Sequence, residues 1–137
     1  MGSEMCIRDS DKASLHLSIG RVMLAHMHAS ESQEKLLEVV GHLNRGSELV
    51  ESQNEKRIIA ELNLKAGIKA SQSSAYTEAL SYLEIGQKQL CENKWKDDYD
   101  LSWGISENLQ RCFYLTGDWD KADVWSTTLL DLSLIHI

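Results

Sequence analysis

Three kinds of residue in this sequence invite a chemical interpretation, and histidine is the first, because imidazole binds transition metals and transfers protons. His26 and His28 lie two residues apart. On a helix this spacing directs the rings to different sides, so we expect exposed or helix-terminal residues and no metal site. His42 invites comparison with the phosphoacceptor of a histidine kinase, but Leu-Asn-Arg-Gly follows it in place of acidic residues and proline. We therefore predict a packing or helix-terminal role for His42.

The second kind is an acidic cluster of Asp97, Asp98 and Asp100. Paired carboxylates can transfer protons or bind a cation. Carboxylates in the first turn of a helix are also favoured by the helix dipole, and we prefer this simpler explanation. The sequence contains no GxxxxGK[ST] phosphate loop, no glycine-rich kinase loop and no HRD or DFG motif. We predict no catalytic residue, no cofactor and no metal ion.

Aromatic residues give a third set of candidates, the tryptophans Trp95, Trp103, Trp119 and Trp125. They could stack on a ligand, but large side chains commonly fill the space between helix layers. We expect them to be such anchors, with Trp119 packed in a turn.

The elements that hold these side chains are predicted to be helices. The 137 residues include no proline, whereas ordinary usage of about 5% gives about seven. Proline interrupts helices and marks loops, so its absence favours long helices with short turns. The balance of 14 basic and 21 acidic residues, net −7, argues against nucleic-acid binding, which needs a basic face. No apolar run approaches the length of a membrane span.

Apolar residues recur at helical spacing and show no strand alternation, which predicts an all-α fold. The periodicity predicts about six helices, over residues 11–27, 30–46, 55–70, 75–90, 98–115 and 118–130. Ser30 and Gln33 have the form of a capping box. Gly46 and Gly117 are expected to end helices. In the first helix, the predicted inward residues are Leu15, Ile19, Val22, Met23 and Met27, and in the last they are Ala122, Trp125, Leu129 and Leu130.

The predicted helices form pairs that resemble one another. Residues 117–122 have the form of the turn in a tetratricopeptide repeat, in which a glycine ends one helix and a small alanine lets the next approach closely. The equivalent alanines, Ala79 and Ala122, are 43 residues apart, longer than the standard repeat of about 34, and the consensus proline is missing. We therefore predict antiparallel helix pairs stacked as a divergent tetratricopeptide-like α-solenoid.

The two ends do not continue this pattern. One DNA coding of Met5–Ser10 has a reverse complement that encodes Leu132–Ile137, and this DNA resembles the transposase end sequence used to fragment and tag DNA. We predict that residues 1–10 and 132–137 are translated adapter. Residues 11–131 are then a 121-residue helical-repeat fragment of a longer reading frame.

Three segments, HLNRG at 42–46, AELNLKAG at 60–67 and AYTEAL at 75–80, closely resemble one family of proteins in their order and spacing. The family comprises large bacterial signalling proteins in which a serine/threonine kinase-like domain precedes a predicted AAA/STAND-type ATPase. A tetratricopeptide-like region follows, often with a sensor domain and a C-terminal histidine kinase. The resemblance covers most of residues 14–130. It implies that this chain is the helical region after the ATPase module, a scaffold or regulatory segment for signal transduction.

From the repeat alignment, we expect the first helices of each pair to line a concave face that binds protein. The candidate partner-binding residues are Glu61, Ile68, Glu107, Arg111 and Tyr114. The partner would be a neighbouring domain of the parent chain or a peptide, with no nucleic acid and no membrane.

The resulting prediction is a non-catalytic interaction segment of a kinase/ATPase. Two alternatives stay open. One is the sensor repeat region of a STAND-type transcriptional regulator, and the other is a self-contained helical-bundle enzyme or ligand carrier. Within residues 11–131 the cysteines are Cys91 and Cys112, without CxxC spacing, which favours a reducing, cytoplasmic setting.

Overall fold

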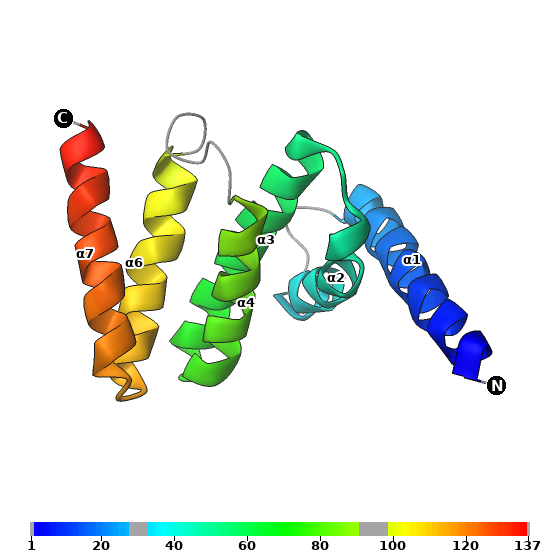
Figure 1. The fold of residues 1–137 in the computed structure, drawn as a ribbon, viewed down its shortest axis with the longest axis horizontal. Coiled ribbons are helices and arrows are strands. Elements are labelled where there is room, and N and C mark those ends of the chain that lie inside the picture. The colour runs from blue at the N-terminus through cyan, green and yellow to red at the C-terminus, as the bar shows by residue number, and fades with distance from the viewer. Residues whose placement is uncertain (1, 28–32, 91–98, 137) are drawn as a thin grey trace. The chain divides into compact units, whose positions relative to one another are not determined.

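The computed structural model describes residues 2–27, 33–90 and 99–136, and these ranges consist of helices joined by short turns, with no strand among them (Figure 1). The helices in these ranges are α1 (Gly2–His26), α2 (Gln33–Arg45), η1 (Ser47–Leu49, a 3₁₀ turn), α3 (Gln53–Gln72), α4 (Tyr76–Gln89), α6 (Tyr99–Leu115) and α7 (Trp119–His136). The prediction of an all-α fold with about six helices in adjacent pairs is thus confirmed over the described ranges. α1 and α7 continue through the predicted adapter segments; helical backbone there does not test their origin, which stays a prediction.

The chain divides into two compact units, Met1–Ile59 and Ala60–Ile137. In the first unit α1 packs against α2 and η1. Two glycines make this contact close. A Cβ built on Gly20 would lie 2.8 Å from Cδ2 of Leu43, and one on Gly46 would lie 2.6 Å from the backbone oxygen of Ala13. The apolar residues buried in this unit are Leu17, Val39, Val40, Leu43, Val50 and Ile59.

An ion pair also joins α1 to the start of α3 within the first unit. Arg21 donates two hydrogen bonds to the Glu55 carboxylate, from Nε at 2.8 Å and Nη2 at 2.7 Å. These hydrogen bonds from Arg21 lower the pKa of the Glu55 carboxyl. The Arg21 side chain is 50% exposed, so the pair adds little to stability.

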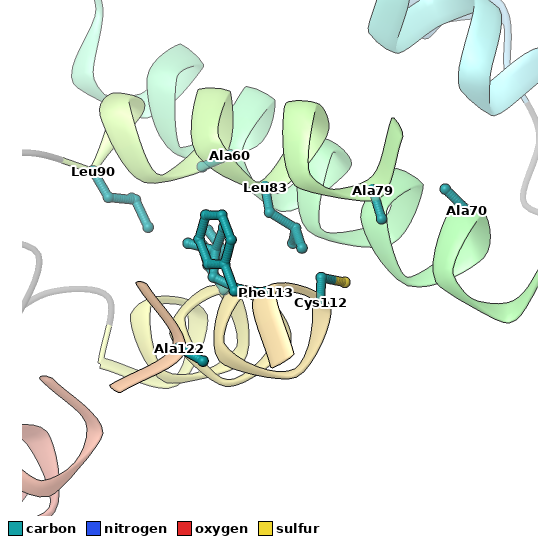
Figure 2. Close-up of a cluster of buried hydrophobic side chains, with 10 residues drawn as sticks. Ala60, Ala70, Ala79, Leu83, Leu90, Cys112, Phe113 and Ala122 are labelled. Carbon is teal, nitrogen blue, oxygen red and sulfur yellow. The ribbon is translucent and has the colours of Figure 1, made fainter. Parts of the chain in front are cut away.

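The second unit has its own core, built from α3, α4, α6 and α7 (Figure 2). Leu83 of α4 lies over Gly67 of α3, where an added Cβ would be 2.7 Å from Cγ and Cδ2 of Leu83. Phe113 and Cys112 of α6 face these helices in Figure 2. Ala79 and Ala122, the two alanines aligned from the repeat pattern, are 0% and 3% exposed. The small residue expected at the close approach of each pair is therefore buried in both.

Four side chains that were predicted to face inward or to pack in a turn are exposed instead. Leu15 and Val22 of α1 are 58% and 59% exposed, and Leu17 is buried instead, because Gly20 sets the face on which Leu43 can approach. Leu130 is 66% exposed on α7. Trp119 is 65% exposed rather than packed in its turn. Lys121 makes the contact there, with Nζ 5.5 Å from the Phe113 ring centroid.

Gly117 ends α6 in the left-handed region, with φ of +85°. Asp118 then begins α7, where its Oδ1 accepts a hydrogen bond from the Lys121 backbone N–H at 3.4 Å. The predicted stop and cap are thus confirmed. The capping box at Ser30 lies outside the described residues.

Replacing Gly117 by alanine should lower the free energy of unfolding by about 1–2 kcal/mol, because a Cβ is strained at positive φ. No atom outside the turn lies within 4 Å of the added Cβ, so the loss comes from backbone conformation alone. Gly117→Asn should lose less, since asparagine tolerates this region. Urea denaturation of the three proteins measures the difference, and equal losses for alanine and asparagine would contradict the explanation.

Candidate partner-binding surface

Three of the five predicted partner-binding residues lie on α6, where the helix spacing aligns them. Glu107 and Arg111 are one turn apart, and Arg111 Nη2 donates to Glu107 Oε1 at 3.2 Å. Trp103, one turn earlier, donates from Nε1 to the other carboxylate oxygen of Glu107 at 2.9 Å. Tyr114 follows Arg111 by three residues and is 61% exposed. The Glu107 carboxylate therefore organises an indole and a guanidinium on one exposed helix face.

The other two candidates lie on α3, on either side of Leu64. Glu61 is exposed and Ile68 is 37% exposed. Leu64 packs over Gly104 of α6, where an added Cβ would lie 3.0 Å from its Cδ2. The faces of α3 and α6 that carry the candidates therefore adjoin through a Leu64–Gly104 contact. We call Glu61, Ile68, Glu107, Arg111 and Tyr114 together the α3–α6 surface.

Sequence reasoning missed the part of Trp103 in this surface, having expected a buried anchor. Trp103 is half-buried, and its ring lies beside Tyr99 with 6.4 Å between ring centroids. The spacing of an indole and a carboxylate at residues 103 and 107 was the signal in the sequence. Trp125 does pack against the core of the second unit, as expected of an anchor, and Trp95 lies outside the described residues.

Of the three histidines considered from the sequence, His26 and His42 lie in the described part of the chain. His26 is exposed at the end of α1, where its Nδ1 donates to the Val22 carbonyl at 2.9 Å. This agrees with the expected helix-terminal role, and His28 lies outside the described residues. His42 is half-buried and pairs with His16 of α1 at 2.9 Å between Nδ1 atoms. The sequence did not single out His16, because the contact spans 26 residues and depends on how α1 meets α2.

The acidic cluster and the cysteine show no arrangement for catalysis within the described residues. Asp100 lies in the first turn of α6 and is exposed, as expected for a carboxylate at a helix start; Asp97 and Asp98 lie outside the described residues. Cys112 is a free thiol, and burial raises its pKa, which disfavours a reactive thiolate. Among the residues described, no group of three or more His, Cys, Asp or Glu side chains could hold a metal ion.

A cleft of about 220 Å³ lies between α1 and α2, with Val22, Met23, His26, Met27, Lys35 and Val39 as its lining. Cavities that hold drug-sized ligands or cofactors are commonly about 300–1,000 Å³. The α1–α2 cleft is therefore small for a cofactor, and its walls offer few polar groups that would orient one.

Comparison with known proteins gives one informative similarity. The sequence is 27% identical over 118 residues to a protein described as hybrid signal transduction histidine kinase G, from Dictyostelium discoideum. The aligned part is 75% of this chain but 3% of that protein, so the chain spans a small fraction of the relative's length. No family model matches the sequence, and no solved structure matches it. The similarity links this chain to a region of a signal-transduction histidine kinase.

Within the described ranges, no helix combines the length and the apolar composition that crossing a bilayer requires.

Proposed function

We propose that this chain is a non-catalytic helical-repeat segment of a large signal-transduction protein and that it acts through protein contacts. The observation that carries the proposal is the similarity of three quarters of the chain to part of a hybrid histidine kinase. The paired helices, with Ala79 and Ala122 at equivalent buried positions, support a tetratricopeptide-like array. The resemblance of the segments at 42–46, 60–67 and 75–80 to large bacterial signalling proteins supports a more specific proposal. In that proposal, the chain follows a predicted AAA/STAND-type ATPase module in a cytoplasmic kinase.

The α3–α6 surface is the proposed contact region. Tryptophan, tyrosine and arginine supply a large share of the binding energy in protein interfaces, and Trp103, Arg111 and Tyr114 lie within four turns of one helix. The Glu107 carboxylate holds the Trp103 indole and the Arg111 guanidinium in place. This preorganisation reduces the entropy that a partner must remove on binding. The partner is a neighbouring domain of the parent chain or a peptide, as helical-repeat surfaces accept.

The DNA that flanks this sequence in its source encodes the segments with which binding can be tested. We expect the same reading frame to encode an ATPase module upstream and a histidine kinase downstream. These flanking segments, purified separately, can be titrated with the chain by calorimetry. Start and stop codons directly beside codons 11 and 131 would contradict the proposal, as would ATP hydrolysis by the purified chain.

Arg111→Glu, which reverses the charge of one anchor, and Tyr114→Ala, which truncates another, should each weaken binding of the flanking segment about tenfold or more. The Glu107–Arg111 pair is exposed, so its loss should leave the fold intact. Lys88→Glu on α4 and Leu130→Ala on α7 are matched controls, because Lys88 and Leu130 are exposed and lie outside the surface. Equal weakening by variants and controls would exclude the α3–α6 surface.

A further inference from the structure

The two half-buried imidazoles of the first unit, His16 and His42, point directly at each other. Their Nδ1 atoms are 2.9 Å apart, the ring centroids are 5.1 Å apart, and the ring planes differ by 26°. The centroids are farther apart than the nitrogens by about one ring width. The rings therefore meet end to end in nearly one plane, which is the geometry of an N–H donating to a lone pair rather than of face-to-face stacking.

This geometry restricts how many protons the pair can hold. In a neutral imidazole one ring nitrogen donates and the other accepts, whereas both nitrogens of an imidazolium donate. Two neutral rings can make the His16–His42 hydrogen bond, and so can one neutral ring and one imidazolium. Two imidazolium rings cannot, because two N–H groups would then face each other at the 2.9 Å contact.

The charges around the His16–His42 pair disfavour the binding of a second proton to it. Lys12 lies one turn before His16 on α1, and Arg45 lies three residues after His42 on α2. Burial lowers the pKa of His16, and the nearby charges of Arg45, His42 and Lys12 lower it further. The carboxylates of the elements packed here, Glu38 of α2 and Glu48 of η1, are exposed and are not among the charges that shift the pKa of His16.

The pair is also placed where its separation would move a helix. Leu17 and Leu43, the residues next to the two histidines, are buried in the core of the first unit. Gly20 lies directly under Leu43. Repulsion between the two rings therefore acts across the contact that joins α1 to α2.

We propose that the His16–His42 pair is a pH-sensitive latch, which holds α1 against α2 while at most one of its rings is charged and releases α1 when both are. Because the folded state resists protonation of His16, the unfolded chain binds more protons as the pH falls below about 6.5, the ordinary pKa of histidine. Stability is then complete above that pH and is lost as the pH falls. The latch thus makes the first unit responsive to mild acid.

Urea denaturation of the full chain between pH 7.5 and pH 5 tests the latch. One additional proton bound by the unfolded state raises the unfolding equilibrium constant by up to about tenfold for each unit that the pH falls. His42→Gln should remove much of this dependence, because a glutamine amide can donate to a neutral His16 or accept from a charged one. His26→Gln is the matched control, since His26 is an exposed histidine of α1 with a local hydrogen bond.

The same pH dependence in the unsubstituted protein and in His42→Gln would overturn the latch. If His42→Gln does not fold, nitrogen-15 NMR of the imidazoles in the unsubstituted protein provides a second test of the latch. At pH 7.5 we expect one protonated and one unprotonated Nδ1 in the pair, and two separated titration steps on acidification. If protonation of one ring of the pair has no effect on protonation of the other, the latch is also excluded.

Discussion

Gly46→Ala should lower the free energy of unfolding by about 3 kcal/mol, at the upper end of the usual cost of overpacking. The added Cβ would lie 2.6 Å from the Ala13 carbonyl oxygen, 2.6 Å from Leu17 Cβ and 3.0 Å from the Leu17 nitrogen. Two of these atoms are backbone, which no change of rotamer can move. The alanine must therefore push α1 away from α2 and open the core around Leu17.

Gly41→Ala is the control, because Gly41 lies in α2 five residues before Gly46 and no atom beyond the helix's own backbone lies within 4 Å of its added Cβ. It should raise the free energy of unfolding by up to about 1 kcal/mol, since alanine favours the helix. Circular dichroism at 222 nm during urea denaturation follows helices of both units. All four tryptophans lie in the second unit, so tryptophan fluorescence follows that unit separately. Equal effects of Gly41→Ala and Gly46→Ala would show that the close contact does not decide the result.

The number and order of the helices could be predicted from the sequence, because apolar periodicity and glycine stops are local signals. The third predicted helix began two residues from the observed start of α3, and its residues Ile59, Leu62 and Ala66 are buried as the stripe required. The direction of α1 could not be predicted in the same way. Its apolar residues occur on more than one side, and the choice of Leu17 over Leu15 depends on where Leu43 meets Gly20.

In the α3–α6 surface, contacts within one helix could likewise be predicted from the sequence, and contacts between helices could not. The Glu107–Arg111 pair follows from four-residue spacing on one helix. By contrast, Leu64 over Gly104 is a contact between helices 40 residues apart in the sequence, and it brings Glu61 and Ile68 beside the α6 face. The His16–His42 contact is likewise distant in sequence. Periodicity assigns residues to helix faces, but it does not say which faces meet.

Leu83→Ala should lower the free energy of unfolding by about 3 kcal/mol or more, within the range of about 2–5 kcal/mol for buried leucines. Leu83 is fully buried in the core of the second unit. Its removal leaves a cavity against Gly67, which has no side chain to move into the space. Tryptophan fluorescence during urea denaturation measures the loss, since Trp125 packs against the same core. A loss below about 1 kcal/mol would contradict tight packing at this position.

Gly67→Ala then tests whether the absence of a side chain at residue 67 is what lets α4 approach α3. Alone it should destabilise by about 1–3 kcal/mol, because its Cβ would lie 2.7 Å from Cγ and Cδ2 of Leu83. In the Leu83→Ala background those two leucine atoms are absent. Gly67→Ala should then be neutral, or should stabilise by up to about 1 kcal/mol because alanine favours the helix. Leu109→Ala removes an equally buried leucine from the same cluster but leaves Leu83 over Gly67. In that background the penalty of Gly67→Ala should persist, so a double-mutant cycle should give coupling with Leu83 and additivity with Leu109.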